Sequence, residues 1–266
     1  MKKTHFILFK QRRTSIKILE ELIVDNVKIE RKTSTKFLGV MIDANLNFND
    51  HVQYIKGKVA RGIGILCKCR RLFKKETLVT LYNAFLYPYL AYCVSVWGST
   101  YDTYLDPLIK LQKRAMRIID GVRRDAPTSP IYLRLRILKF KQIYMNAIQL
   151  FVFKFHKTFI QSDDQEFDIN ERVRISKDKL PDTFIFFQLN GSFHSHDTKS
   201  KNKFRPPALK GPVASRTVRV LGVNSFNYFL DKINIESSFL SYKIALKNFI
   251  ITNELSSLDS LIPAGN

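Results

Sequence analysis

Short apolar runs, rich in β-branched and aromatic residues, mark the first 43 residues of the chain. The runs are THFILF, ELIV, VKI and KFLGVMI, and this composition is typical of β-strands. Asp25-Asn26 lies between the second and third runs and predicts a tight turn, because both residue types tolerate positive φ. Gly39 interrupts the last run and predicts a bulge or the close approach of another backbone.

From residue 49 the apolar positions recur at intervals of three or four, which is the period of a helix buried on one face. The apolar positions are Val52, Ile55, Val59, Ile63 and Leu66. The basic residues on the opposite face are Lys58, Arg61 and Lys68. Asn49 or Asp50 offers an N-cap. Gly62 and Gly64 weaken a helix by up to about 1 kcal/mol each, so we expect a packing reason for both.

Residues 77–101 form a run of 25 residues without a charge. A membrane-spanning helix needs about 20 apolar residues, but this run contains Asn83, Pro88, Ser95 and five tyrosines, and tyrosine prefers the membrane interface. We therefore expect two buried helical segments, one beginning near Lys75 and the next opened by Pro88. Trp97 and the tyrosines could stack on bases, but a run without charges favours burial in a protein core.

The clearest helical pattern extends from about Thr103 to Asp120, with Gly121 as its C-cap. Its apolar stripe consists of Leu105, Leu108, Ile109, Met116 and Ile119. Its opposite side carries Lys110, Lys113, Arg114 and Arg117, and the basic surface continues at Arg123 and Arg124. An ordinary solvated face would mix both signs of charge. The stretch from Leu108 to Ile119 contains no acid, which favours a phosphate-binding face.

A long helix is expected over 139–158, where Ile143, Ala147, Phe151 and Phe155 are spaced for burial. The acidic segment SDDQEFD follows, residues 170–220 show no strong periodicity, and a last helix is expected over 239–250. The whole pattern predicts an α+β fold that is mainly α. A short N-terminal β-hairpin or sheet edge precedes a helical bundle and a small mixed C-terminal region.

The net charge of +21, from 44 basic and 23 acidic residues, is concentrated in residues 1–160, which hold 30 basic and 11 acidic residues. A charge of this size opposes compaction unless a polyanion neutralises it, which points to nucleic acid or an anionic membrane as partner. The hydrophobic share of 45% excludes general disorder. Three cysteines cannot close a disulfide framework, and the N-terminus has too short an apolar run for a signal peptide. We expect an intracellular protein, nuclear or cytoplasmic.

Candidate metal ligands are few and badly spaced. Cys67 and Cys69, with Cys93 far away, do not supply the four ligands of a structural zinc site, and His194-x-His196 has no third ligand nearby. Asp25 and Asp43 are single carboxylates and cannot hold the two metal ions of a polymerase. We therefore expect no catalytic residue, metal or cofactor site in this chain.

The order of the segments resembles the reverse transcriptase of non-LTR retrotransposons, particularly the jockey-like lineage. KKTHFILF resembles the segment after the catalytic aspartate hairpin, and KFLGVMID resembles the primer-grip hairpin, with Phe37, Leu38 and Gly39 at its centre. Residues 46–124 resemble the thumb helices, and LQKRAMRII resembles the end of the thumb. Weaker likenesses to C-terminal boxes occur at 194–199, 222–227 and 242–247.

This resemblance implies a palm edge over 1–45, a helical thumb over 46–160 and a C-terminal extension over 161–266. It implies that the chain holds template–primer nucleic acid, RNA or an RNA–DNA duplex, during RNA-directed DNA synthesis. The family's catalytic aspartates lie upstream of the matching region, and no Ala-Asp-Asp occurs here. We therefore expect a truncated polymerase that is inactive alone, with Mg²⁺ bound only when the palm core is present. The alternatives are a stand-alone nucleic-acid-binding protein and a membrane-associated protein built on 77–101.

Overall fold

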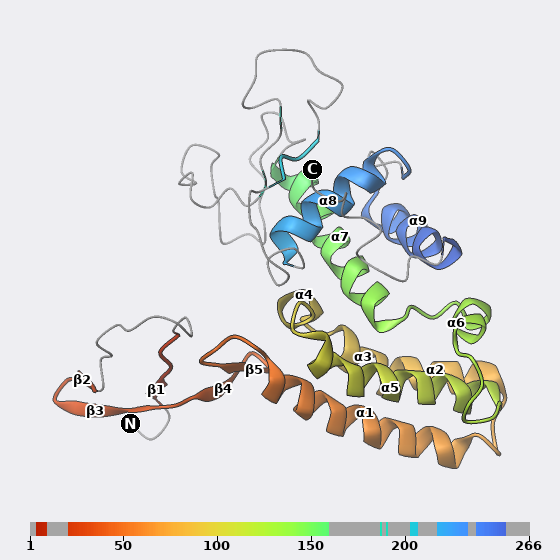
Figure 1. Cartoon of the computed structure of the whole chain (residues 1–266), viewed down its shortest axis with the longest axis horizontal. Coiled ribbons are helices and arrows are strands. Elements are labelled where there is room, and N and C mark those ends of the chain that lie inside the picture. Colours follow the sequence, from red (N-terminus) through yellow and green to blue (C-terminus); the bar gives the residue numbers. More distant parts are fainter. Residues whose placement is uncertain are drawn as a thin grey trace. The chain divides into compact units, whose positions relative to one another are not determined.

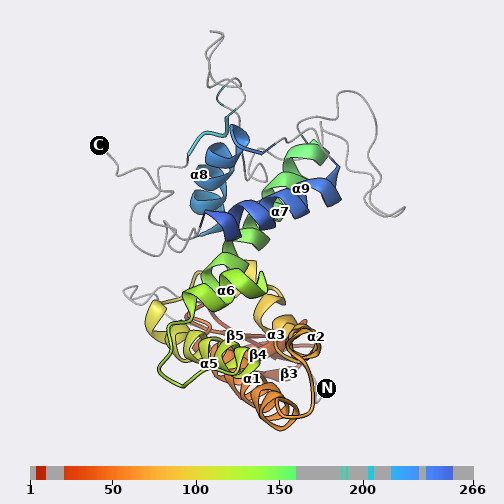
Figure 2. The ribbon, with the colours of Figure 1, turned by 90° about the vertical axis from the view of Figure 1, so that its right-hand side faces the viewer.

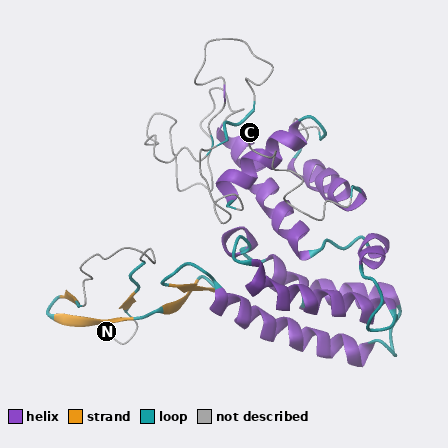
Figure 3. Ribbon diagram, viewed as in Figure 1, coloured by secondary structure: helices purple, strands orange, loops and turns teal. Residues whose placement is uncertain are grey.

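The computed structural model describes residues 4–9, 21–159, 187, 190, 203–206, 217–233 and 238–253. They form the mainly helical α+β fold that the sequence predicts (Figures 1 and 3). The chain divides into two compact units, residues 1–128 and 129–266, which are described separately. The division into three parts at residues 45 and 160 stays a prediction.

The strands of the first unit form two small sheets. Their bounds are β1 His5–Phe6, β2 Leu22–Val24, β3 Val27–Arg31, β4 Ser34–Phe37 and β5 Val40–Asp43. One sheet has the order β1-β3-β2, with β1 parallel and β2 antiparallel to β3. Asp25 and Asn26 form the predicted turn between β2 and β3, with φ of 49° and 57°. The second sheet is the antiparallel pair β4–β5, in which Phe37 faces Val40.

The KFLGVMI run is therefore two strands and a turn, so the prediction of a single strand with a bulge is wrong. Leu38 and Gly39 form the two-residue turn, and both have positive φ, at 44° and 85°. This is the backbone that tight hairpins favour, because its twist matches that of the flanking strands. A Cβ on Gly39 would lie 3.1 Å from Cε1 of Tyr92, so the close neighbour is a side chain and not a backbone.

The helices of the first unit are α1 Asn49–Cys69, α2 Lys75–Phe85, α3 Tyr87–Ala91, α4 Val94–Trp97 and α5 Asp102–Asp120. Figures 1 and 2 show α1, α2 and α5 side by side as a bundle. The predicted apolar faces of α1 and α5 are buried, except that Ile109 is only half-buried. Gly121 ends α5 with φ of 74°, as predicted. The N-cap of α1 is Phe48, in the left-handed region, and neither Asn49 nor Asp50.

The uncharged run 77–101 is divided among α2, α3 and α4, with the left-handed Cys93 separating the last two. Tyr82, Leu86, Leu90 and Trp97 from this run are fully buried, as expected. Tyr92 and Tyr101, however, are about half exposed, at 53% and 51%. In the described parts of the chain, no helix combines the length and apolarity needed to cross a bilayer.

Gly62 has the predicted packing reason and Gly64 does not. A Cβ on Gly62 would lie 2.7 Å from Cδ1 of Leu86 and 3.0 Å from the backbone oxygen of Phe85, whereas one on Gly64 meets nothing within 4 Å. We expect Gly62→Ala to destabilise the fold by about 1–3 kcal/mol, because the backbone oxygen cannot move aside. Gly64→Ala is the matched control and should stabilise by up to about 1 kcal/mol. Urea unfolding measures both, and equal effects would contradict the packing argument.

The second unit is built from α6 Ser129–Leu135, α7 Phe140–Phe159, α8 Val218–Leu230 and α9 Phe239–Thr252. The long helix and the last helix were predicted, whereas α8 was not. The prediction of which face of α7 is buried is partly wrong. Phe151 was predicted to be buried and is 48% exposed, whereas Ile148 and Val152 are fully buried. Both rows are apolar, so periodicity alone cannot choose between them. Helix α8 packs against the row that contains Ile148 and Val152. The contact is close at Gly222, where an added Cβ would lie 2.9 Å from Val152 and 3.2 Å from Ile148.

Two of the C-terminal boxes lie on described helices, and the box at 194–199 lies outside the described residues. Gly222 allows α8 to approach α7, Phe226 is buried, and Asn227 exchanges two hydrogen bonds of 2.8 and 2.9 Å with the backbone of Phe204. Tyr242 of α9 stacks on Phe153 of α7 at 3.9 Å between ring centroids. These boxes therefore have packing roles in the second unit.

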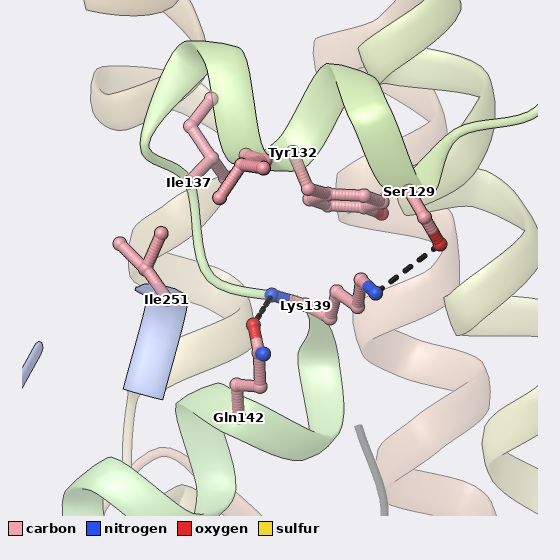
Figure 4. A pocket seen from close by; sticks show the side chains of 7 residues that line it. Ser129, Tyr132, Ile137, Lys139, Gln142 and Ile251 are labelled. Atoms are coloured by element: carbon pink, nitrogen blue, oxygen red, sulfur yellow. Dashed lines mark hydrogen bonds between the residues drawn. The ribbon is translucent and has the colours of Figure 1, made fainter. Parts of the chain in front are cut away.

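A small pocket of the second unit is not a ligand site. Figure 4 shows it between α6, the start of α7 and Ile251, with the Lys139 ammonium donating a hydrogen bond to the Ser129 hydroxyl. Its volume is about 10 Å³, close to the minimum needed for a single water molecule.

Candidate nucleic-acid interface

The tip of the β4–β5 hairpin is an exposed apolar surface. Phe37 and Leu38 are 60% and 75% exposed, so neither belongs to the core. The Leu38 carbonyl accepts a hydrogen bond of 2.7 Å from the Tyr92 hydroxyl, which ties the turn to the α3–α4 connection. Leu38 holds a left-handed conformation that costs an L-residue about 1 kcal/mol or more. The hairpin turn is thus an exposed projection tied to the helices by Tyr92, and its role as a primer grip stays a prediction.

A cleft of about 270 Å³ lies beside this hairpin, lined by Lys36, Gly39, Tyr54, Tyr89 and Tyr92 among others. The Lys36 ammonium donates to the Tyr54 hydroxyl at 3.4 Å and lies 5.0 Å from the centre of its ring. Lys58 lies over the same ring at 5.4 Å. The two ammonium groups lower the pKa of Tyr54, with the hydrogen bond from Lys36 as the main cause. The fold thereby brings Lys58 of α1 next to the hairpin.

His51 forms part of the same cleft. It is 2% exposed, and its Nδ1 accepts a hydrogen bond of 3.2 Å from the Met41 backbone, while its ring meets Trp97 edge-on at 5.2 Å. Burial, helped by the positive charge of Lys36, lowers the pKa of His51 from 6.5 to about 4. The side chain is therefore neutral at physiological pH, with its proton on Nε2.

The basic face of α5 is exposed over most of its length. Lys110, Lys113 and Arg114 are exposed, and no carboxylate in the described part of the chain pairs with them. Arg117 differs, because it is half-buried and its Nε donates to the Ala126 carbonyl at 2.8 Å. The geometry therefore leaves three cations of this helix available to bind phosphates, and Arg117 serves to hold the loop after α5.

The remaining predicted cations are also at the surface. Arg61 and Lys68 are exposed on α1, and Arg124 is exposed after α5. Arg123 makes an ion pair of 3.5 Å with Asp125, in which both side chains are largely exposed. Such a pair is worth about 1 kcal/mol at most, so it does not prevent Arg123 from meeting a phosphate.

The carboxylates considered for catalysis have structural positions. Asp25 lies in the β2–β3 turn. Asp43 is 8% exposed and accepts backbone hydrogen bonds from Asn45, Asn47 and Phe48 at 3.0, 3.2 and 2.7 Å. Across the described residues, no group of three or more His, Cys, Asp or Glu side chains could hold a metal ion, and Cys67, Cys69 and Cys93 are free thiols.

Sequence reasoning did not find Lys36, Tyr54 and Tyr92 as neighbours of the hairpin. Lys36 directly precedes Phe37, so its position next to the hairpin tip could have been predicted from the sequence. Tyr54 and Tyr92 are far from the hairpin in sequence and gave no signal, because only the packing of α1 and α3 against β4–β5 brings them there.

Comparison with curated proteins links the chain to mobile elements. It is 28% identical over 102 residues to the "Probable RNA-directed DNA polymerase from transposon X-element" of Drosophila melanogaster. It is 27% identical over 128 residues to the "RNA-directed DNA polymerase from mobile element jockey" of the same species, and 28% identical over 104 residues to the jockey protein of Drosophila funebris. The chain contains a region related to jockey-like reverse transcriptases.

The reverse-transcriptase-related region covers 37%, 47% and 38% of this chain in the three comparisons. It spans only 11%, 14% and 11% of the three relatives, so the chain matches a small part of each polymerase. No protein-family model matches the chain. No solved structure matches it either.

Proposed function

We propose that this chain binds nucleic acid, and that it serves as the part of a reverse transcriptase that holds the template–primer without carrying out the polymerase reaction. The exposed cations of α5 carry the proposal. Lys110, Lys113 and Arg114 are exposed on a helix whose other face is buried, within a stretch, 108–119, that contains no acidic residue. Such a surface follows a phosphate backbone without reading its sequence.

Two further observations support an RNA–DNA duplex as the ligand. The relatives are named as RNA-directed DNA polymerases. The hairpin likened to a primer grip projects Phe37 and Leu38 into solvent beside a cleft that Lys36 lines, and Lys58 lies over the ring of Tyr54 in that cleft. Apolar and aromatic groups next to cations suit a nucleic-acid end, where bases and phosphates are both accessible.

The salt dependence of binding tests this proposal. We expect log Kd for a short RNA–DNA duplex to rise steeply with log salt concentration. Replacing Lys110, Lys113 and Arg114 together by Ala should make the slope shallower by about 2 to 2.7, because each lost phosphate contact removes about 0.7–0.9. Fluorescence anisotropy across a series of salt concentrations measures both slopes.

The second unit supplies a matched control. Arg219, Lys243 and Lys247 are exposed there, and replacing these three by Ala removes the same net charge from a different surface. The control should leave the slope nearly unchanged. A flat salt dependence of the unmodified chain, or equal slopes for the two triple variants, would contradict the proposal.

A further inference from the structure

A second basic surface lies at the end of the helical bundle where α1 joins α2. The connection reads Arg70-Arg71-Leu72-Phe73-Lys74 and is followed by Lys75 and Glu76. The cations predicted from the sequence as binding residues lie on α1 up to Lys68 and on and after α5, and none belongs to this connection. Nothing in the proposed function uses it.

The connection is held in a defined conformation. The backbone N–H of Arg70 donates to Leu66, and those of Leu72 and Phe73 both donate to Cys69, at 2.9 to 3.1 Å. The backbone of this connection is therefore fixed against the end of α1. Phe73 remains 49% exposed and Leu72 76% exposed, although both are large apolar residues.

A cleft of about 410 Å³ opens beside the connection. Arg70, Arg71 and Phe73 line one side, and Leu78, Ile118 and Ile119 add apolar surface from α2 and α5. The volume lies in the range of small-molecule sites, about 300–1,000 Å³. A single nucleotide is a ligand of this size, with an apolar ring and a charged phosphate.

The charge of the cleft is positive. Its one carboxylate, Asp120, is buried and accepts a hydrogen bond of 2.8 Å from Lys75, so these two charges offset each other. No carboxylate among the described residues pairs with Arg70 or Arg71. Two guanidinium groups therefore face the cleft without an internal counter-ion, and guanidinium binds phosphate through paired hydrogen bonds.

We propose that this cleft binds one unpaired nucleotide, with its base stacked on Phe73 and its phosphate held by Arg70 and Arg71. The proposal rests on the proposed function, because it assumes that the chain meets nucleic acid. It adds a preference for a single-stranded extension next to a duplex. An exposed aromatic ring beside arginines is the arrangement that stacks unpaired bases with little sequence preference.

The test compares two ligands, a blunt RNA–DNA duplex and the same duplex with an unpaired extension. The unmodified chain should bind the extended duplex more tightly. Phe73→Leu keeps apolar contact with the cleft but removes the aromatic face, so it should weaken binding to the extended duplex by about 5- to 100-fold. Binding to the blunt duplex should not change. Phe73→Tyr should retain the preference, and Leu72→Ala is the exposed apolar control that should also retain it.

The arginines are tested in the same assay. Replacing Arg70 and Arg71 by Ala should make the salt slope for the extended duplex shallower by about 1.4, since each contact with a single-stranded phosphate contributes about 0.7. The matched control replaces Lys243 and Lys247 of α9, both exposed, and should leave that slope unchanged. Circular dichroism and the thermal midpoint confirm that each variant is folded.

The outcomes separate this inference from the proposed function. Equal affinity of the unmodified chain for the two duplexes, or an unchanged preference in Phe73→Leu, overturns the nucleotide cleft and leaves the proposed function standing. Failure to bind either duplex overturns both. A third arm uses anionic phosphatidylserine vesicles: if Phe73→Leu loses vesicle binding while its affinity for the extended duplex is unchanged, the surface binds membrane and the inference is wrong.

Discussion

Replacing Asp43 by Ala is expected to lower the free energy of unfolding by about 3–5 kcal/mol. The Asp43 carboxylate accepts three backbone N–H groups of the loop between β5 and α1. That loop holds Leu46 and Phe48 in the left-handed region, with φ of 53° and 55°. Without the carboxylate, the three N–H groups lose their partner at a site that is 8% exposed, in a loop that already holds two residues in strained backbone conformations.

The same loop positions the candidate interface. It joins the hairpin to α1, so Asp43→Ala should also weaken duplex binding through the loss of that arrangement. Asp43→Asn keeps one acceptor oxygen but turns an NH₂ group toward a backbone N–H, so it should lie between Ala and the unmodified chain. Asp106→Ala removes an exposed carboxylate of α5 and should change stability by about 0.5 kcal/mol at most. Urea unfolding at neutral pH measures all three, and a loss equal to that of Asp106→Ala would contradict the role of Asp43.

The stability of the chain is expected to fall by about 3 kcal/mol through His51 alone as the pH is lowered from about 7 to about 4. The pKa of His51 is lowered from 6.5 to about 4 by burial and by Lys36. Between these two values the unfolded chain binds a proton at this residue and the folded chain does not. Unfolding is therefore favoured as the pH falls through this window, and the loss is complete below the folded pKa.

His51→Asn isolates this contribution from the other titrating groups. Its side-chain oxygen can accept the hydrogen bond that Nδ1 takes from Met41, and it does not titrate. The variant should be less stable than the unmodified chain near pH 7, because the ring contact with Trp97 is lost. The difference in unfolding free energy should then move by about 3 kcal/mol in favour of the variant on going to about pH 4. A constant difference across that range would show that His51 titrates normally.

The buried faces of two helices of the first unit could be predicted from their apolar spacing, whereas the buried face of α7 could not. In α1 and α5 a single row of residues is apolar and the opposite row is charged, so only one face can be buried. In α7 the rows through Phe151 and through Val152 are both apolar, and contact with α8 decides between them. The position of the hairpin at KFLGVMI likewise depends on a residue that is distant in sequence. Its turn is held by Tyr92, which is 54 residues from Leu38.

The candidate site likewise combines features that the sequence predicts with features that depend on tertiary contacts. Exposure of Lys110, Lys113 and Arg114 could be predicted because they lie opposite a buried stripe on one helix. The hydrogen bond of Arg117 could not be predicted, because its partner is the backbone carbonyl of Ala126 in the loop after α5. The contact of Lys58 with Tyr54 is local, since the two residues are four apart on α1. The approach of Lys36 to Tyr54 had no local signal, because it depends on how β4 lies against α1.

The sequence by itself determined where the long helices α1, α5 and α7 lie, how the positive charge is distributed and which protein family the chain resembles. Each of these depends on residue types and on spacings of a few residues, which a linear pattern contains. Only the tertiary structure decided which distant side chains meet: Tyr92 at the hairpin turn, and Arg70 and Arg71 with Phe73 beside a neutralised Asp120. These contacts follow from helix packing, because a buried interface brings together residues that have no relation along the chain.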